Sequence, residues 1–150
     1  MEQLIYLIPL FPLVSFLIIA LSGKSLSKTI TTFLAPGSIL ASFIVALILF
    51  ASQLSHPQAL TAPLFSWIHV GDFHADFSLL IDTLSILFTL VITGVGFLIH
   101  VYSTGYMHDE KDYNRYFAYL NLFVFFMLIL VLGDNLLSMF IGWEGVGICS

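Results

Sequence analysis

The stretch YFAYLNLFVFFMLILVL, residues 116–132, is an uninterrupted run of mostly apolar residues without a single charge. About 20 such residues are needed for a helix to cross a bilayer, so even this short run predicts a membrane-spanning helix. The whole chain agrees, because 59% of its 150 residues are hydrophobic and 9% are charged. Soluble domains carry about 25% charged residues. Such a chain cannot cover its apolar surface in water, and we interpret it as an integral membrane protein.

Working outward from this run, the sequence predicts an all-α polytopic helix bundle with four complete spans and the beginning of a fifth. The predicted helices cover residues 4–21, 30–51, 79–102, 116–132 and 135–150. Pro9 and Pro12 fall in the early turns of the first helix, where a missing N–H costs least. Pro36-Gly37 predicts a kink or a late start in the second.

The fifth helix is expected to begin after Gly133-Asp134-Asn135, since Asp or Asn there suits an N-cap. Only about 15 residues follow, too few to cross, and a half-crossed helix would leave backbone groups unsatisfied in lipid. We therefore expect residues 1–150 to be the N-terminal part of one transmembrane domain in a longer protein.

The basic residues predict the orientation of the chain. Lys24 and Lys28 lie between the first two helices, and Lys111 and Arg115 lie between the third and fourth. The long loop of residues 52–78 has no Lys or Arg. The positive-inside rule places both basic loops on the inner side and the N-terminus and the 52–78 loop outside.

The outer loop itself predicts a small β-hairpin. Residues 64–70 are rich in aromatic and β-branched side chains, residues 73–77 alternate apolar and polar, and Gly71-Asp72 suits a two-residue turn. We expect the hairpin, over residues 64–77, to lie on the membrane surface with its aromatic face against the helices. In that register His69 faces His74. A metal site there is conceivable, but two histidines and one carboxylate fall short of the four ligands of structural zinc, so a structural or solvated pair is favoured.

Several classes of function are excluded by composition. The single cysteine, Cys149, gives no disulfide framework and no Cys-based metal site. No cluster-ligand spacing and no glycine-rich dinucleotide loop is present, so we expect no cofactor in this chain. The four basic residues are too few and scattered for nucleic-acid binding.

Glu144 is the principal candidate for a functional residue. Counting from Asn135, it lies about 14 Å into a hydrocarbon core roughly 30 Å thick, near the bilayer midplane. Ionisable residues at that depth usually face a bundle interior or water and serve transport. The alternative is a protonated, hydrogen-bonded structural glutamate. Gly142, Gly145 and Gly147 around it favour close helix approach and leave room for water.

Two further ionisable residues are candidates for proton transfer. Asp82, in the first turn of the third helix, is either a carboxylate favoured by the helix N-terminus or part of a proton path. His100, near the inner end of that helix, is a candidate because the ordinary pKa of histidine as a residue type suits a relay, although a packed interfacial histidine is the simpler interpretation. Asp134 is most simply a helix cap, and residues 109–112 a solvated loop.

A resemblance adds to this interpretation. GWEGVGICS, preceded by LVLGDNLLSMF, resembles the fifth helix of the large antiporter-like subunit of respiratory complex I, called subunit L in bacteria and NADH dehydrogenase subunit 5 in mitochondria and chloroplasts. LLIDTLSILFTLVITGVGFLIHVYSTGYM resembles its third helix and DYNRYFAYLNLF its fourth. The similarity runs over residues 67–150, and the residues present do not depart from the family pattern.

The resemblance implies a subunit with well over ten helices that translocates protons, driven by quinone reduction elsewhere in the complex. Glu144 falls on the family's helix-five glutamate, which pairs with a lysine on a later helix. Partners would be other membrane-arm subunits, the lipid bilayer and protons. NADH, flavin, iron–sulfur clusters and quinone would belong to other subunits. The resemblance favours a bacterial inner (plasma) membrane over a mitochondrial inner membrane or a thylakoid.

Two functions remain open at this point. The first is a proton-pumping subunit of NADH-quinone oxidoreductase without a redox centre of its own. The second is the large subunit of a multisubunit cation/proton antiporter, which shares the fold and the helix-five glutamate. GWEGVG favours the first, because the antiporter relatives diverge around that glutamate. A purely structural anchor is disfavoured by Glu144.

Overall fold

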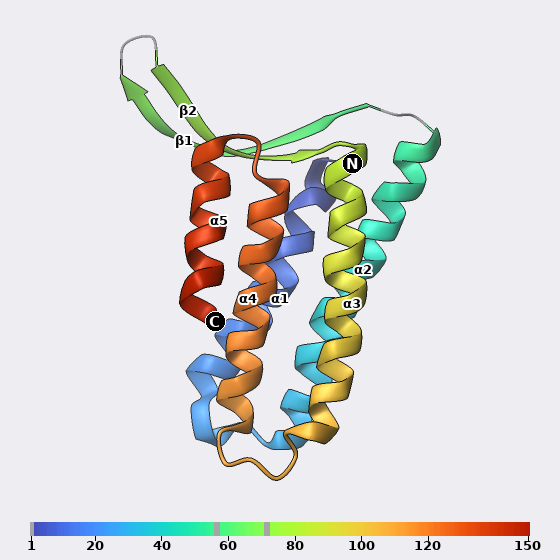
Figure 1. Cartoon of the computed structure of the whole chain (residues 1–150), viewed down its shortest axis with the longest axis vertical. Coiled ribbons are helices and arrows are strands. Elements are labelled where there is room, and N and C mark those ends of the chain that lie inside the picture. The colour runs from blue at the N-terminus through green and yellow to red at the C-terminus, as the bar shows by residue number, and fades with distance from the viewer. Residues whose placement is uncertain (1, 56–57, 71–72) are drawn as a thin grey trace.

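The computed structural model describes residues 2–55, 58–70 and 73–150 (Figure 1). Its elements, in chain order, are α1 (Glu2–Ser22), the short 3₁₀ helix η1 (Gly23–Ser25), α2 (Lys28–Ser55), β1 (Leu60–Val70), β2 (Phe73–Ile81), α3 (Thr83–Tyr106), α4 (Tyr113–Leu132) and α5 (Leu136–Cys149). By length and apolar composition α1 to α4 can each cross a membrane, whereas α5 is shorter. The predicted all-α membrane bundle with a small hairpin is confirmed.

The two ends of the bundle are distinct. The hairpin, the N-terminus and the α4–α5 turn lie at one end, which we call the outer end (Figure 1). The two loops that carry the basic residues, between α1 and α2 and between α3 and α4, share the opposite, inner end (Figure 1). The grouping of the loops that the positive-inside rule predicted is therefore present in the fold.

Several helix boundaries differ from the prediction. α2 begins at Lys28 and continues through Pro36, so the late start at Pro36-Gly37 is wrong. α3 begins at Thr83 rather than at residue 79, because residues 79–81 pair with residues 60–62 as part of β2. α4 begins at Tyr113, which brings Arg115 into its first turn. The predicted spans of the second and fourth helices contained no basic residue. The observed helices are longer and include Lys28 in α2 and Arg115 in α4.

Close helix contact at α4 and α5 depends on two of the three predicted glycines. A Cβ on Gly142 would collide with the backbone of Leu130, and one on Gly145 would collide with the ring of Phe126. The two glycines therefore let the helices approach closely, as in other small-residue membrane interfaces. Gly147 has no atom within 4 Å of such a Cβ among the described residues, so it has no part in this contact.

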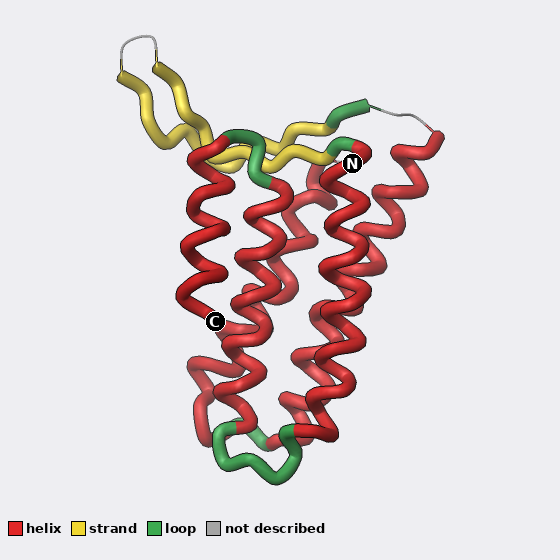
Figure 2. The backbone as a smooth tube through the Cα atoms, viewed as in Figure 1, coloured by secondary structure: helices red, strands yellow, loops and turns green. Residues whose placement is uncertain are grey.

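The hairpin has the predicted pairing but extends farther and lies differently. β1 and β2 pair antiparallel from Leu60 with Ile81 to Val70 with Phe73, with two irregularities, and His69 pairs with His74 as expected. Its base lies across the outer ends of the helices, while its distal part rises away from the bundle (Figure 2). Phe65 and Trp67 are 56% and 43% exposed, so an aromatic face lying wholly against the helices is wrong. The predicted turn at Gly71-Asp72 lies outside the described residues.

Hydrogen bonds fasten the hairpin base to the helix ends. The Tyr6 hydroxyl donates to the carbonyl of Pro63 at 2.6 Å, and the Ser78 hydroxyl donates to the carboxylate of Asp134 at 2.8 Å. Asn135 caps α5, because its side-chain oxygen accepts from the backbone N–H of Ser138 at 2.9 Å. Asp134 is therefore a tether between β2 and the α4–α5 turn, and its interpretation as a cap is wrong.

Candidate functional site

A buried polar network lies between the helices towards the inner end of the bundle. His100 on α3 is fully buried. It lies six residues before the end of α3, or about 9 Å inside it, which is deeper than an interfacial position. Its Nδ1 is 2.7 Å from the carbonyl oxygen of Gly96, and its Nε2 is 3.1 Å from Oδ1 of Asn121 on α4. The imidazole thus has a partner at each ring nitrogen.

The network continues from α4 into α1 and α2. Asn121 is also fully buried, and its Nδ2 donates to Oγ of Ser15 on α1 at 2.8 Å. The Ser15 hydroxyl in turn donates to the carbonyl oxygen of Leu34 on α2, at a longer 3.4 Å. Buried polar groups usually need partners, and this network joins all four complete spans.

The chemistry of the network accommodates both protonation states of His100. In this arrangement each ring nitrogen of His100 faces an oxygen that can only accept a hydrogen bond. Both bonds can form only if both nitrogens carry a proton, as in the imidazolium ion. The oxygen and nitrogen of an amide are nearly interchangeable in shape, so the Asn121 amide also fits after a 180° rotation. Its Nδ2 then donates to the unprotonated Nε2 of a neutral imidazole. Its Oδ1 accepts the Ser15 hydroxyl proton, which must turn away from the carbonyl oxygen of Leu34 to reach it. Gain or loss of a proton at His100 is thereby matched by rotation of one amide.

Other buried polar side chains share a face of α3. Ser85, Thr89 and Thr93 are buried at successive turns. Thr89 and Thr93 donate to carbonyl oxygens of their own helix, those of Ser85 and Thr89, at 2.8 and 2.7 Å. Their hydroxyl protons are thus committed within α3, and these groups do not by themselves extend the His100 network to the outer end.

Asp82 is the N-cap of α3. Its carboxylate accepts from the backbone N–H of Ser85 at 2.7 Å, and the Ser85 hydroxyl accepts from the Asp82 backbone N–H at 2.9 Å. This reciprocal pair is a capping box. The hydrogen bond from the Ser85 backbone lowers the pKa of Asp82 below its ordinary value of 3.8. The geometry favours the capping interpretation over a group that readily binds a proton near neutral pH.

Glu144 is exposed on α5, eight residues or about 12 Å from the start of that helix. The neighbouring Gly142 and Gly145 are buried against α4, so the carboxylate lies on a different face. No hydrogen bond or ion pair joins it to another described residue. α5 contacts α4 and β2 but not α3, so the fold does not bring Glu144 together with His100 or Asp82.

Comparison with known proteins assigns the chain to a family. Residues 67–117 match the family described as NADH-Ubiquinone oxidoreductase (complex I), chain 5 N-terminus. The chain is 44% identical over 142 residues to NADH-quinone oxidoreductase subunit L of Escherichia coli, a match that covers 94% of this chain and 23% of that protein. The subunit L of Pseudomonas aeruginosa is 45% identical over 144 residues, with the same coverages. That of Mycobacterium tuberculosis is 47% identical over 114 residues, 74% of this chain and 18% of the relative.

The chain belongs to the complex I subunit L family. It spans about a quarter of the length of the subunit L proteins it matches. The expected family resemblance is confirmed, and the matched region of residues 67–117 contains both Asp82 and His100.

Sequence reasoning missed two residues of the buried network, Asn121 and Ser15. A signal was present for Asn121, because it is the only amide in the apolar run of residues 116–132. Ser15 gave no such signal, since serine is common in membrane helices and often bonds to its own backbone. Within the described residues, no group of three or more His, Cys, Asp or Glu side chains converges as a metal site.

Proposed function

We propose that this chain is part of a proton-translocating membrane-arm subunit of NADH-quinone oxidoreductase, in which Glu144 binds and releases protons. NADH, flavin, iron–sulfur clusters and quinone would be held by other subunits of the complex. Quinone reduction there would drive proton transfer through buried ionisable residues here. The relatives that carry the name subunit L support this assignment.

The position of Glu144 carries the proposal. A carboxylate about 12 Å inside a membrane helix, with no partner among the described residues, is costly unless it meets a cation, water or a proton. Gly142 and Gly145 pack against α4 on a face of α5 that does not carry Glu144. The carboxylate is therefore free to meet groups of the longer protein. A lysine on a later helix, as the resemblance implies, would supply the cation.

His100 is the second proton-carrying group of the proposal. A relay must hold a proton and lose it without leaving buried polar groups unpaired, because an unsatisfied buried group costs about 1–3 kcal/mol. Rotation of the Asn121 amide, together with a turn of the Ser15 hydroxyl from Leu34 to the amide oxygen, would keep both ring nitrogens of His100 partnered at either protonation state. Asp82 has a lesser, tuning role, because its carboxylate is committed to the N-terminus of α3.

The test is substitution of Glu144 in the full-length subunit within the assembled complex. Glu144→Gln keeps size and hydrogen bonding but cannot titrate, so the complex should assemble while proton pumping falls sharply. NADH–quinone turnover should fall with it if the two are tightly coupled. Glu144→Asp should retain part of the activity, because it keeps the titrating group and shortens its reach by one methylene.

The measurement is proton uptake against electron transfer in sealed vesicles. Glu110→Gln is the matched control, since it removes an exposed carboxylate from the α3–α4 loop and should leave pumping unchanged. Normal pumping by a fully assembled Glu144→Gln complex would return Glu144 to a structural role. Co-purification with an NADH-oxidising arm separates this function from that of a cation/proton antiporter, which would lack such a partner.

A further inference from the structure

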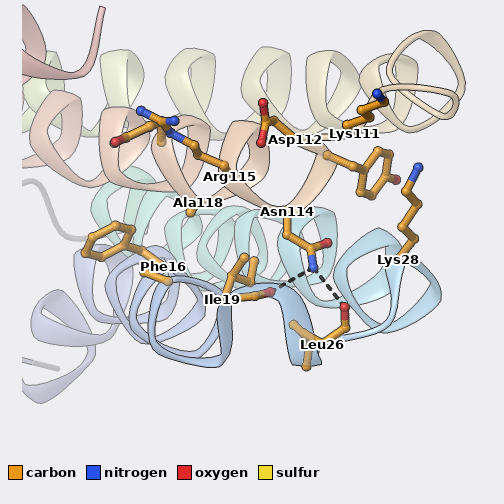
Figure 3. Close-up of a pocket in the computed structure, with 13 residues that line it drawn as sticks. Phe16, Ile19, Leu26, Lys28, Lys111, Asp112, Asn114, Arg115 and Ala118 are labelled. Atoms are coloured by element: carbon orange, nitrogen blue, oxygen red, sulfur yellow. Dashed lines mark hydrogen bonds between the residues drawn. The ribbon is translucent and has the colours of Figure 1, made fainter.

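A cavity of about 820 Å³ opens at the inner end of the bundle, between the end of α1 and the beginning of α4 (Figure 3). Phe16 and Ile19 of α1 line it, together with Lys28, Lys111 and Arg115. Three of the four basic residues in the chain thus border one cavity. With the carboxylate of Asp112, which also lines it, the lining carries three positive charges and one negative, a net of two positive.

The cations are arranged at two depths. Figure 3 shows Lys28 and Lys111 at one end of the cavity and Phe16 at the other. The Arg115 guanidinium lies over the ring of Tyr119, 5.5 Å from its centroid and one helical turn farther into the membrane span. Among the described residues, none of these three cations has a carboxylate within ion-pair distance.

The framework around the cations is fixed by hydrogen bonds. Lys28 Nζ donates to the carbonyl oxygens of His108 and Glu110, both at 2.9 Å, which leaves one of its three protons for a ligand. The Asn114 amide donates to the carbonyl oxygens of Gly23 and Leu26 at 3.2 and 2.8 Å. The loop after α1 and the first turn of α4 are thereby held together at the cavity wall.

We propose that this cavity binds a phospholipid with an anionic headgroup. The phosphodiester would lie at the level of Lys28 and Lys111 with Arg115 on its membrane side, and an acyl chain would run along Tyr119, Ile19 and Phe16. Phe16 lies six residues before the end of α1, or about 9 Å into the span, which is the depth of acyl chains rather than of headgroups. This apolar part favours a lipid over a free phosphate, and basic pockets between helices at the inner surface suit anionic headgroups.

The experiment uses the assembled complex in nanodiscs with phosphatidylglycerol that carries a photoreactive group on one acyl chain. Mass spectrometry of peptides should find adducts on the α1 segment of residues 16–20. In Lys111→Gln/Arg115→Gln these adducts should fall about 30-fold, because each basic residue near an anionic lipid is worth a factor of about five. Lys24→Gln is the control, since it removes a charge from the same side of the membrane, and it should change little.

Two further arms make the test specific. The charge-conserving Lys111→Arg/Arg115→Lys should restore the adducts, and excess inorganic phosphate should not displace the lipid. Equal labelling by a photoreactive phosphatidylcholine, or undiminished labelling in the double glutamine variant, would overturn the proposal. So would displacement by phosphate, which would indicate a soluble anion. Absence of adducts in the unsubstituted complex would show that protein covers the cavity instead.

Should the double variant fail to assemble, Arg115→Gln alone should still reduce the adducts about fivefold.

Discussion

Nε2 of His100 on α3 lies 3.1 Å from Oδ1 of Asn121 on α4, with both side chains fully buried inside the helix bundle. The contact ties a titratable ring to an amide whose two orientations suit the two protonation states of that ring. A merely packed histidine would also need a hydrogen-bond partner, but a single orientation of the amide would be enough for it. The pair is therefore the point at which the proposed relay can be tested apart from structure.

Asn121→Asp should uncouple assembly from proton transfer. The carboxylate would hold His100 as an imidazolium and would oppose release of its proton, so pumping should fall while the complex still assembles. Asn121→Leu should lower both, because one ring nitrogen then lacks a partner at a cost of about 1–3 kcal/mol. The readouts are proton uptake, electron transfer and the amount of assembled complex.

The control for these variants is Ser42→Ala. The Ser42 hydroxyl is also buried and donates to the carbonyl oxygen of Ile8 at 2.7 Å, outside the His100 network. Its loss should cost stability without changing pumping per assembled complex. If Asn121→Asp pumped as well as the unsubstituted complex, His100 would have only a packing role.

Asp82→Asn should leave most of the pumping intact. Asparagine is as good an N-cap as aspartate, so α3 should begin normally, whereas Asp82→Ala should cost about 1 kcal/mol. The folded-state pKa of Asp82 is below 3.8, so the stabilisation by its carboxylate is complete above that value and is lost only as pH falls through the folded pKa. The pH profile of pumping near neutrality should therefore match that of the unsubstituted complex. A loss as deep as that of Glu144→Gln would instead place Asp82 on the proton path.

Gly142→Ala should impair assembly of the full-length subunit, whereas Gly147→Ala should not. An added Cβ at Gly142 meets the backbone of Leu130, which no side-chain rotation can relieve. Overpacking of this kind typically costs about 1–3 kcal/mol, occasionally more. At Gly147 the same substitution meets no described atom within 4 Å and gains helix propensity. Thermal stability of the detergent-purified complex is the measurement, and equal losses in the two variants would refute the difference.

Labelling with an impermeant thiol reagent tests the orientation. A cysteine in place of Ser55, at the hairpin end of α2, should react from outside the cell, and one in place of Lys111 should not. Cys149 is replaced by serine in both variants so that the introduced thiol is the only one among residues 1–150. The reverse labelling pattern would invert the topology.

Local features were largely predictable from the sequence. The apolar runs gave the four spans, because their number and length follow from the thickness of a bilayer. Asn135 was recognised as a possible cap of α5, since capping depends on residues three positions apart. The pairing of His69 with His74 followed from strand alternation around a short turn. The start of α3 was harder to predict from the sequence, because Leu79 and Ile81 suit both a helix and a strand. Their pairing with residues of β1 determines that they belong to a strand.

The sequence by itself determined a membrane bundle, the grouping of its basic loops and the position of Glu144 along α5. Only the tertiary structure decided which faces of the helices meet. In lipid, exposed and buried faces are both apolar, so hydrophobic periodicity does not show how a helix is rotated. The contact of His100 with Asn121 and of Asn121 with Ser15 joins residues 21 and 106 positions apart, and depends on that rotation. The face that Glu144 presents was fixed in the same way, by the steric fit of Gly142 and Gly145 against α4.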